Sequence, residues 1–148
     1  MAQATTIKFG QQYILVGDGA TPTEVFEMPC GITSLTKAIS TTTADVDIPD
    51  CVDPDAFSWL GIDVNSKRMT LTFSGVLAQE ALELWDDWSM ENATKNVRWY
   101  RNIGAPNQGY WGGPAILTEY QEQAENKGRY QVSGTIVFDG KPVWTAAP

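Results

Sequence analysis

The chain has 148 residues, a formal net charge of −8, two cysteines and no histidine. A domain of this length buries about 68–70% of its unfolded surface, so it needs neither a metal nor a disulfide to fold. The acidic surface repels phosphate backbones, which argues against tight binding of nucleic acid.

Catalytic and cofactor-binding motifs are also missing. Without histidine there is no Ser–His or Cys–His pair to activate a nucleophile. The glycines at 112–113 are followed by proline, which excludes a phosphate-binding loop there. The closely spaced aspartates at 45–55 lack the glycine that a calcium loop needs at its sharp turn. We therefore expect no enzyme activity, no metal and no cofactor.

The N-terminal stretch MAQATTIKFG has no apolar run of signal-peptide length, and no segment is long enough to span a membrane. We expect a soluble protein made in the cytoplasm. Cys30 and Cys51 would then be free thiols at synthesis, and burial as free cysteines is favoured over a disulfide.

Alternating apolar and polar residues predict strands in the first third of the chain. We expect strands at 11–16 and 24–28, joined by a Gly-Asp-Gly turn, and then a threonine-rich strand at 32–43. Lys37 lies on the otherwise apolar side of that third strand.

Residues 45–68 predict a long acidic loop with two prolines. It contains six aspartates, yet it also contains Phe57 and Trp59. Long loops are usually functional or disordered, and aromatic residues argue against disorder. Two hypotheses stay open: a partner orders this loop, or the loop folds back on its own core.

A strand that runs into a helix occupies the middle of the chain. Met69, Leu71 and Phe73 alternate with polar residues, and apolar residues then recur every three or four positions up to Trp88. This pattern predicts a strand followed by an amphipathic helix at about 76–91, around which the strands pack. Acidic residues gather in the second half of this helix, where the helix dipole disfavours them. They either form a contact outside the helix or belong to a solvated face.

Three more strands are expected at 97–103, 110–120 and 130–138. The first of them interleaves Arg98 and Arg101 with aromatic residues, which is one pattern of base-stacking proteins. Because the chain is acidic, pairing of these arginines with the helix, or with the acidic loop of a neighbour, is favoured instead.

The order of these features resembles the major tail tube proteins of long-tailed, lambda-like bacteriophages. The matching run begins with MPCGITSLTKAISTT and continues through the acidic DVDIPDCVDPDAFSW. It passes through MTLTF and GVLAQEALELWDDW, and it closes with ENKGRYQVSGTIVFDGKPVW. Gene-transfer-agent tails use the same kind of protein.

The resemblance implies one domain over residues 1–148, mainly β with one α-helix, as an antiparallel β-sandwich or barrel of the phage tail tube type flanked by that helix. Homohexameric rings would stack into the virion tail tube that delivers DNA without binding it specifically. The partners would be further copies, the tape measure protein, and the tail terminator and distal tail proteins. The chain would be made in the host bacterial cytoplasm.

The resemblance also implies three groups of site residues. The long loop would contact an adjacent ring through Asp45, Asp47, Asp50, Asp53, Asp55, Phe57, Trp59 and Leu60. Positions expected to face the channel are Thr36, Ser40, Thr70, Thr72, Gln131, Ser133 and Thr135. Contacts between subunits would involve Asp86, Asp87, Arg98, Arg101 and Arg129.

A different class of function stays open beside this one. A stand-alone β-sandwich carbohydrate-binding module could stack sugars on Trp99, Tyr110 and Trp111. An acidic hydrolase with paired carboxylates is a weaker third hypothesis, because nothing places two carboxylates in a cleft. Self-assembly of the purified protein would separate these alternatives.

Overall fold

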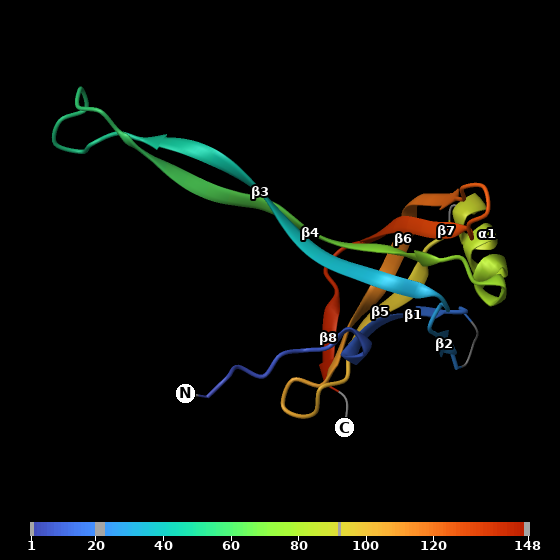
Figure 1. Ribbon diagram of the computed structural model, residues 1–148. Coiled ribbons are helices and arrows are strands. Elements are labelled where there is room, and N and C mark those ends of the chain that lie inside the picture. The colour runs from blue at the N-terminus through green and yellow to red at the C-terminus, as the bar shows by residue number, and fades with distance from the viewer. Residues whose placement is uncertain (1, 20–22, 92, 147–148) are drawn as a thin grey trace.

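The computed structural model describes residues 2–19, 23–91 and 93–146, which form antiparallel strands and one α-helix (Figure 1). The strands are β1 Gln12–Gly17, β2 Phe26–Glu27, β3 Ile32–Ile48, β4 Trp59–Val76, β5 Lys95–Arg101, β6 Gly109–Gln123, β7 Gln131–Phe138 and β8 Val143–Ala146. The helix α1 spans Leu82–Met90, and 3-10 turns lie at Phe9–Gln11 and Gln79–Ala81. The mainly β class with a single helix agrees with the sequence prediction.

The strand order is β2-β1-β5-β6-β7-β4-β3, and β8 pairs with β6 as well. Strand β6 changes partners along its length: its first half pairs with β5 and β8, and its second half pairs with β7. A register shift between Leu117 and Glu119 marks an irregularity of the kind that bends a strand. Strand β6 therefore connects two layers. We call β3, β4, β7 and the second half of β6 the inner layer, and the remaining strands the outer layer.

One hydrophobic core lies between these layers and α1. It takes alternate residues from β1 and β5 of the outer layer and from β4 and β7 of the inner layer. Trp85 and Trp88 of α1 are at most 1% exposed. The ring of Trp85 stacks on that of Phe73 with 4.6 Å between centroids, so the helix is fixed to the inner layer by aromatic packing.

The helix is shorter than the predicted range 76–91. Strand β4 continues to Val76, because Gly75 still pairs with Ile32 of β3 and with Val132 of β7. A 3-10 turn follows before α1 begins. The predicted apolar stripe is nevertheless correct, since its tryptophans are buried.

The predicted loop at 45–68 is wrong. Strands β3 and β4 pair from Ile32–Gly75 out to Ile48–Trp59, and only residues 49–58 lie outside them. The outer part of this hairpin, residues 42–66, projects away from the rest of the chain, and we call it the arm (Figure 1). It does not fold back on its own core, which excludes that hypothesis.

Both cysteines are free and exposed, so the predicted burial is also wrong. Cys51 lies in the turn at the tip of the arm, and Cys30 lies in the segment that leads into β3. The sequence favoured burial because cysteine is an apolar residue, but neither of these segments packs on the core.

Candidate functional site

The inner layer has a core side and a polar side. Met69, Leu71 and Phe73 are at most 5% exposed, which places their neighbours in β4 on the opposite side. All seven positions predicted to face a channel lie on that opposite side, which we call the polar face: Thr36, Ser40, Thr70, Thr72, Gln131, Ser133 and Thr135.

The strand register aligns the residues of the polar face in rows. Thr36, Thr72 and Thr135 are successive partners across three strands, and Glu119 of β6 ends their row. The next row consists of Ser34, Ser74, Ser133 and Gln121. The sequence analysis missed Ser34, Ser74, Glu119 and Gln121, although the same alternation applies to the serines.

Charge on the polar face is sparse. Besides the seven predicted positions, the face includes two charged residues of opposite sign. Arg68 of β4 pairs with Ser40, and Glu119 of β6 pairs with Thr135. The apolar members of the face are Ala38, Val76, Ile116 and Val137. The face is therefore wettable and close to neutral, and it presents no row of cations to a phosphate backbone.

Both edges of the inner layer are open. Strand β3 ends the strand order, and no described strand pairs with its outer edge. On the other side, β5 pairs with β6 only as far as Ala115, which leaves the second half of β6 unpaired on that edge among the described residues. A long unpaired strand edge is a template for pairing with another chain.

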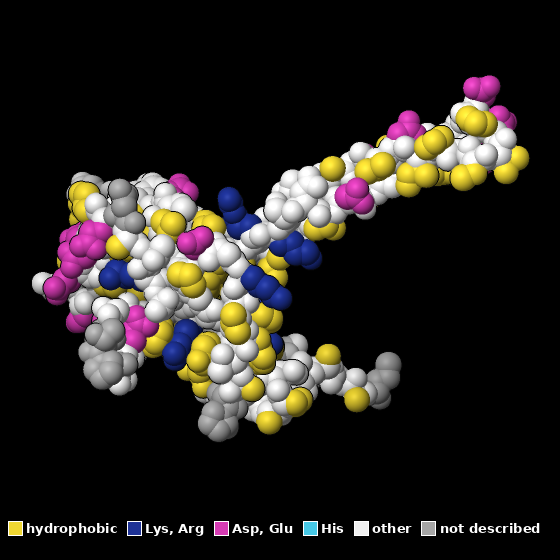
Figure 2. Space-filling view, turned by 180° about the vertical axis from the view of Figure 1, so that it is seen from behind, with side chains coloured by type: hydrophobic (Ala, Val, Ile, Leu, Met, Phe, Trp, Pro, Cys, Tyr) yellow, Lys and Arg dark blue, Asp and Glu magenta, His cyan; other side chains and the backbone are white. Residues whose placement is uncertain are grey.

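Exposed apolar side chains run along both sides of the arm (Figure 2). Leu60, Ile62 and Val64 share one side and are 63%, 68% and 60% exposed. They pair with Asp47, Asp45 and Thr43, so acids border this apolar row. Trp59 is 79% exposed on the other side, and Phe57 meets its ring edge-on at 5.9 Å. Apolar surface on this scale marks a site of protein contact.

Aspartates order the turn at the tip of the arm. Asp50 Oδ1 accepts hydrogen bonds from the backbone N–H groups of Asp53 at 3.0 Å and Val52 at 2.7 Å. These two bonds lower the pKa of Asp50, with the one from Asp53 contributing most. Asp53 in turn accepts a bond from the N–H of Asp55. The tip is thus a built turn with exposed negative charge.

The residues predicted to join subunits do not contact one another within one chain. Asp86 and Asp87 are exposed on α1, and Arg129 is exposed in the turn before β7. The Arg98 guanidinium lies 3.7 Å from the ring centroid of Phe26 and 4.3 Å from that of Tyr110. Within the chain, Arg98 therefore makes cation–π contacts with aromatic rings, whereas the sequence analysis favoured an acidic partner.

Arg101 has a similar environment. Its guanidinium lies 5.4 Å from the ring centroid of Trp144, and its buried Nε has no hydrogen-bond partner among the described residues. Pairing of Arg98 or Arg101 with acids of a neighbouring copy remains a prediction.

The three aromatic residues of the carbohydrate hypothesis do not form a platform. Trp99 is 5% exposed in the core, where its Nε1–H donates to Gln12 Oε1 at 2.8 Å. Trp111 is the direct register partner of Trp99 and shares its side of the sheet, whereas Tyr110 precedes Trp111 in β6 and lies on the opposite side. Sugar stacking on this trio is therefore excluded by the strand geometry.

The described residues contain no group of three or more His, Cys, Asp or Glu side chains placed to hold a metal ion. No helix among them is long and apolar enough to cross a membrane.

Comparisons with known proteins place this geometry in context. Residues 8–144 match the family model described as "Phage tail tube protein". The tail of an empty gene transfer agent (GTA) particle, solved with C6 symmetry, has a TM-score of 0.75 at 14% identity, over 95% of this chain and 100% of that one. The virion of a native GTA particle gives the same values.

The SPP1 tail tube has a TM-score of 0.62 at 9% identity, over 96% of this chain and 81% of that chain. At such identities these structures show a shared fold. The search of curated proteins found no match to this sequence.

Proposed function

The chain belongs to the phage tail tube protein family, and from this premise we propose that it is a structural subunit of a phage-type or GTA-type tail tube. Six copies form a ring, and stacked rings enclose the channel that delivers DNA to a host cell. The partners of the subunit in this proposal are further copies of the chain, the tape measure protein, and the tail terminator and distal tail proteins. The subunit works by assembly and not by catalysis.

The observation that carries this proposal is the inner layer, which is polar on one side and open at both edges. When β3 of one copy pairs with the free edge of β6 in the next, the inner layers join into a closed barrel. The polar face then lines a wet channel. The C6 symmetry of the GTA tail supports six copies as the number that closes the ring.

The arm supplies contact between rings in this proposal. It projects from the body and exposes an apolar row that the rest of the chain leaves uncovered (Figures 1 and 2). A two-stranded ribbon is at most marginally stable in water, so a partner surface stabilises it. The predicted contact residues Asp45–Leu60 all lie on the arm, and their role toward an adjacent ring is part of this proposal.

The near-neutral polar face suits the passage of DNA. A protein that neutralises phosphates with cations releases counterions and binds tightly, which would arrest a moving duplex. The hydroxyl and amide groups of Thr36, Thr72, Gln131 and Thr135 hold water at the wall without holding phosphates.

The test is self-assembly of the purified chain. A concentration series studied by analytical ultracentrifugation and negative-stain microscopy should show rings, and then tubes with a central channel. A protein that stays monomeric at every concentration would contradict the proposal. Binding to a glycan array by that monomer would favour the carbohydrate-binding class, on a surface other than the Trp99 side of the sheet.

A further inference from the structure

A hollow of about 580 Å³ opens where the arm meets the body, a volume typical of pockets that receive a ligand or a large side chain. Its apolar wall includes Ile39 of β3, Met69 of β4 and Trp111 of β6. Its charged residues are Lys37, Lys67, Arg68 and Lys141. We call this hollow the root pocket.

The root pocket is an unfilled end of the hydrophobic core. Ile39 shares the core side of β3 with Leu35, yet it is 58% exposed, whereas Met69, its partner in β4, is 5% exposed. The inner and outer layers are thus in contact at Met69 and open at Ile39. An apolar side chain from another molecule would complete the packing there.

The rim of the root pocket is cationic, and none of the residues that line it is acidic. Lys37 is half-buried, and its Nζ lies 5.8 Å from the ring centroid of Trp99. Burial, and secondarily the charge of Arg101, lower the pKa of Lys37. A carboxylate from outside would stabilise the charged form of Lys37 and so offset both effects. Asp139 lines the adjoining hollow, which shares Lys67 and Arg68 with the root pocket.

The tip of the arm has the complementary chemistry. The turn at the tip, residues 49–58, contains Asp50, Asp53 and Asp55 and no basic residue. The same segment exposes Val52 at 93% and Phe57 at 81%. Figure 2 shows Lys and Arg side chains gathered where the arm leaves the body, and Asp and Glu side chains further out along it. The tip therefore offers acids together with uncovered apolar groups.

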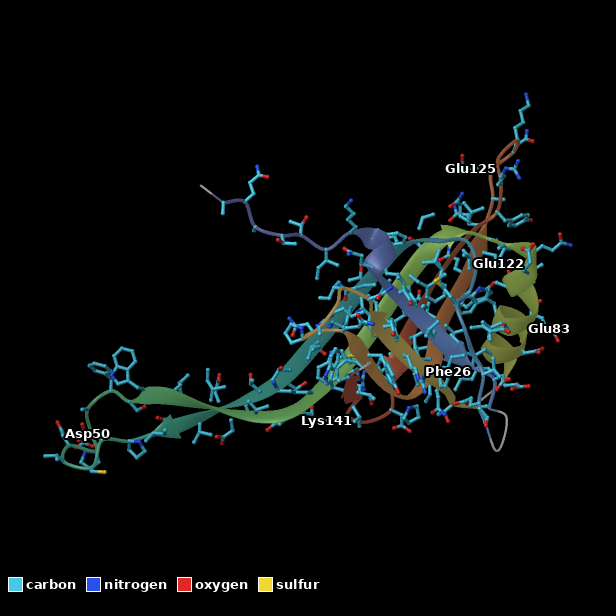
Figure 3. The ribbon with its side chains drawn as sticks, turned by 90° about the horizontal axis from the view of Figure 1, so that it is seen from below. Phe26, Asp50, Glu83, Glu122, Glu125 and Lys141 are labelled. Carbon is cyan, nitrogen blue, oxygen red and sulfur yellow. The ribbon has the colours of Figure 1, made fainter. Side chains whose placement is uncertain are left out.

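We propose that the root pocket receives the arm tip of a second copy of this chain. This inference rests on the proposed tube function and deepens it by naming the receptor for the arm. A chain does not fill its own pocket, because Asp50 at the tip and Lys141 at the pocket lie at opposite ends of the arm (Figure 3). Apolar side chains of the tip enter the hollow, and aspartates meet the cationic rim.

Cysteine cross-linking tests the contact directly, because the native Cys51 already lies exposed at the arm tip. In a Cys30→Ser background, Lys141→Cys places a second thiol at the pocket. Assembled tubes of this variant, mildly oxidised, should yield dimers and higher oligomers joined by a disulfide from residue 51 to residue 141. The matched control Glu83→Cys, on α1 away from the arm, should yield none (Figure 3).

Charge reversal tests the same contact independently of the cross-link. Lys67→Glu with Lys141→Glu should leave the fold and the rings intact, and it should raise the protein concentration needed for tubes by about tenfold or more, since like charges then oppose docking. Adding Asp55→Lys to that variant should lower this concentration again, because the tip then carries a cation that meets the new carboxylates. Asp50 and Asp53 are kept in all variants because their carboxylates hold the turn.

The outcomes separate the inference from the proposed function. Tubes of the Lys141→Cys variant that form no disulfide between residues 51 and 141, or tubes that tolerate the charge reversal, overturn the root pocket as receptor and leave the tube function standing. Absence of any assembly by the wild-type chain contradicts the tube function and the inference together.

Discussion

At the scale of single residues, the contact beneath Phe73 determines how closely the helix can approach the inner layer. A Cβ atom at Gly134 would lie 2.7 Å from Phe73 Cζ and 2.7 Å from the backbone oxygen of Glu119. Both are closer than real Cβ contacts. Only glycine at this position lets the Phe73 ring lie flat against Trp85.

We expect Gly134→Ala to destabilise the fold by about 1–3 kcal/mol, the usual cost of overpacking a filled core. Urea unfolding monitored by tryptophan fluorescence measures the free energy. Gly10→Ala is the matched control: no atom lies within 4 Å of a Cβ there, so its effect should stay within about 0.5 kcal/mol. Equal stability of the two variants would show that the Phe73 ring shifts freely.

Tyr120 gives the fold a dependence on alkaline pH. Its ring stacks on Trp85 at 5.9 Å, and its hydroxyl donates to Glu122 Oε1 at 2.6 Å. Burial, followed by the contact with Glu122, raises the pKa of Tyr120 above the ordinary 10.0. Above that ordinary value the unfolded chain loses the proton and the folded chain keeps it, so stability falls as pH rises.

Above pH 10.0, the ordinary tyrosine pKa, the free energy of unfolding of Tyr120→Phe should therefore fall less steeply with pH than that of the wild type. Urea unfolding at a series of pH values measures the slope, and tyrosinate absorbance follows ionisation in the folded state. If Tyr120→Phe and the wild type lose stability with the same slope, the environment of this hydroxyl does not shift its titration.

At the scale of elements, the arm lies outside the core, so its proposed role in assembly can be tested apart from folding. None of its residues belongs to the core cluster, and the turn at its tip is ordered by its own aspartates. Ala44 and Asp63 are partners across the hairpin, so an Asn-Gly turn can join them in place of residues 45–62.

This truncated chain should melt within a few degrees of the wild type and still form rings, because the core and the edges of the inner layer are retained. It should not form tubes. Differential scanning calorimetry and negative-stain microscopy provide the two readouts. Tubes of normal length from the truncated chain would contradict the role given to the arm.

The arm also shows where reasoning from the sequence failed. Leu60, Ile62 and Val64 alternate with polar residues, which is the period of a strand. Aspartates and two prolines favoured a loop, and both prolines, Pro49 and Pro54, in fact fall in the turn. The alternation is therefore a valid strand signal, and the predicted loop is wrong because it gives more weight to the aspartates and prolines around that signal.

The polar face was predictable for the opposite reason. A buried partner side fixes the alternation of Met69, Leu71 and Phe73, and every second residue must then face outward. The register that aligns Thr36, Thr72 and Thr135 in one row depends on pairing between distant segments. No local pattern encodes that register, and the open edges followed only from the strand order.

At the scale of the whole molecule, the two ends of the arm differ in charge. Its outer part is acidic, and the root pocket at its base is cationic. An arm that enters the pocket of the next copy makes a head-to-tail contact, which repeats without closing. The edge pairing of β3 with β6 that we propose around the ring is also head-to-tail, and a rotation at each step would close it. One chain with two such contacts gives a ring that stacks into a tube.

The most direct test of this account is a cryo-EM map of tubes assembled from the purified chain. We expect six subunits in each ring and a continuous barrel of inner layers, with Thr36, Thr72 and Thr135 facing the channel. A map in which this polar face packs against protein, or in which the β3 and β6 edges remain unpaired, would contradict the account.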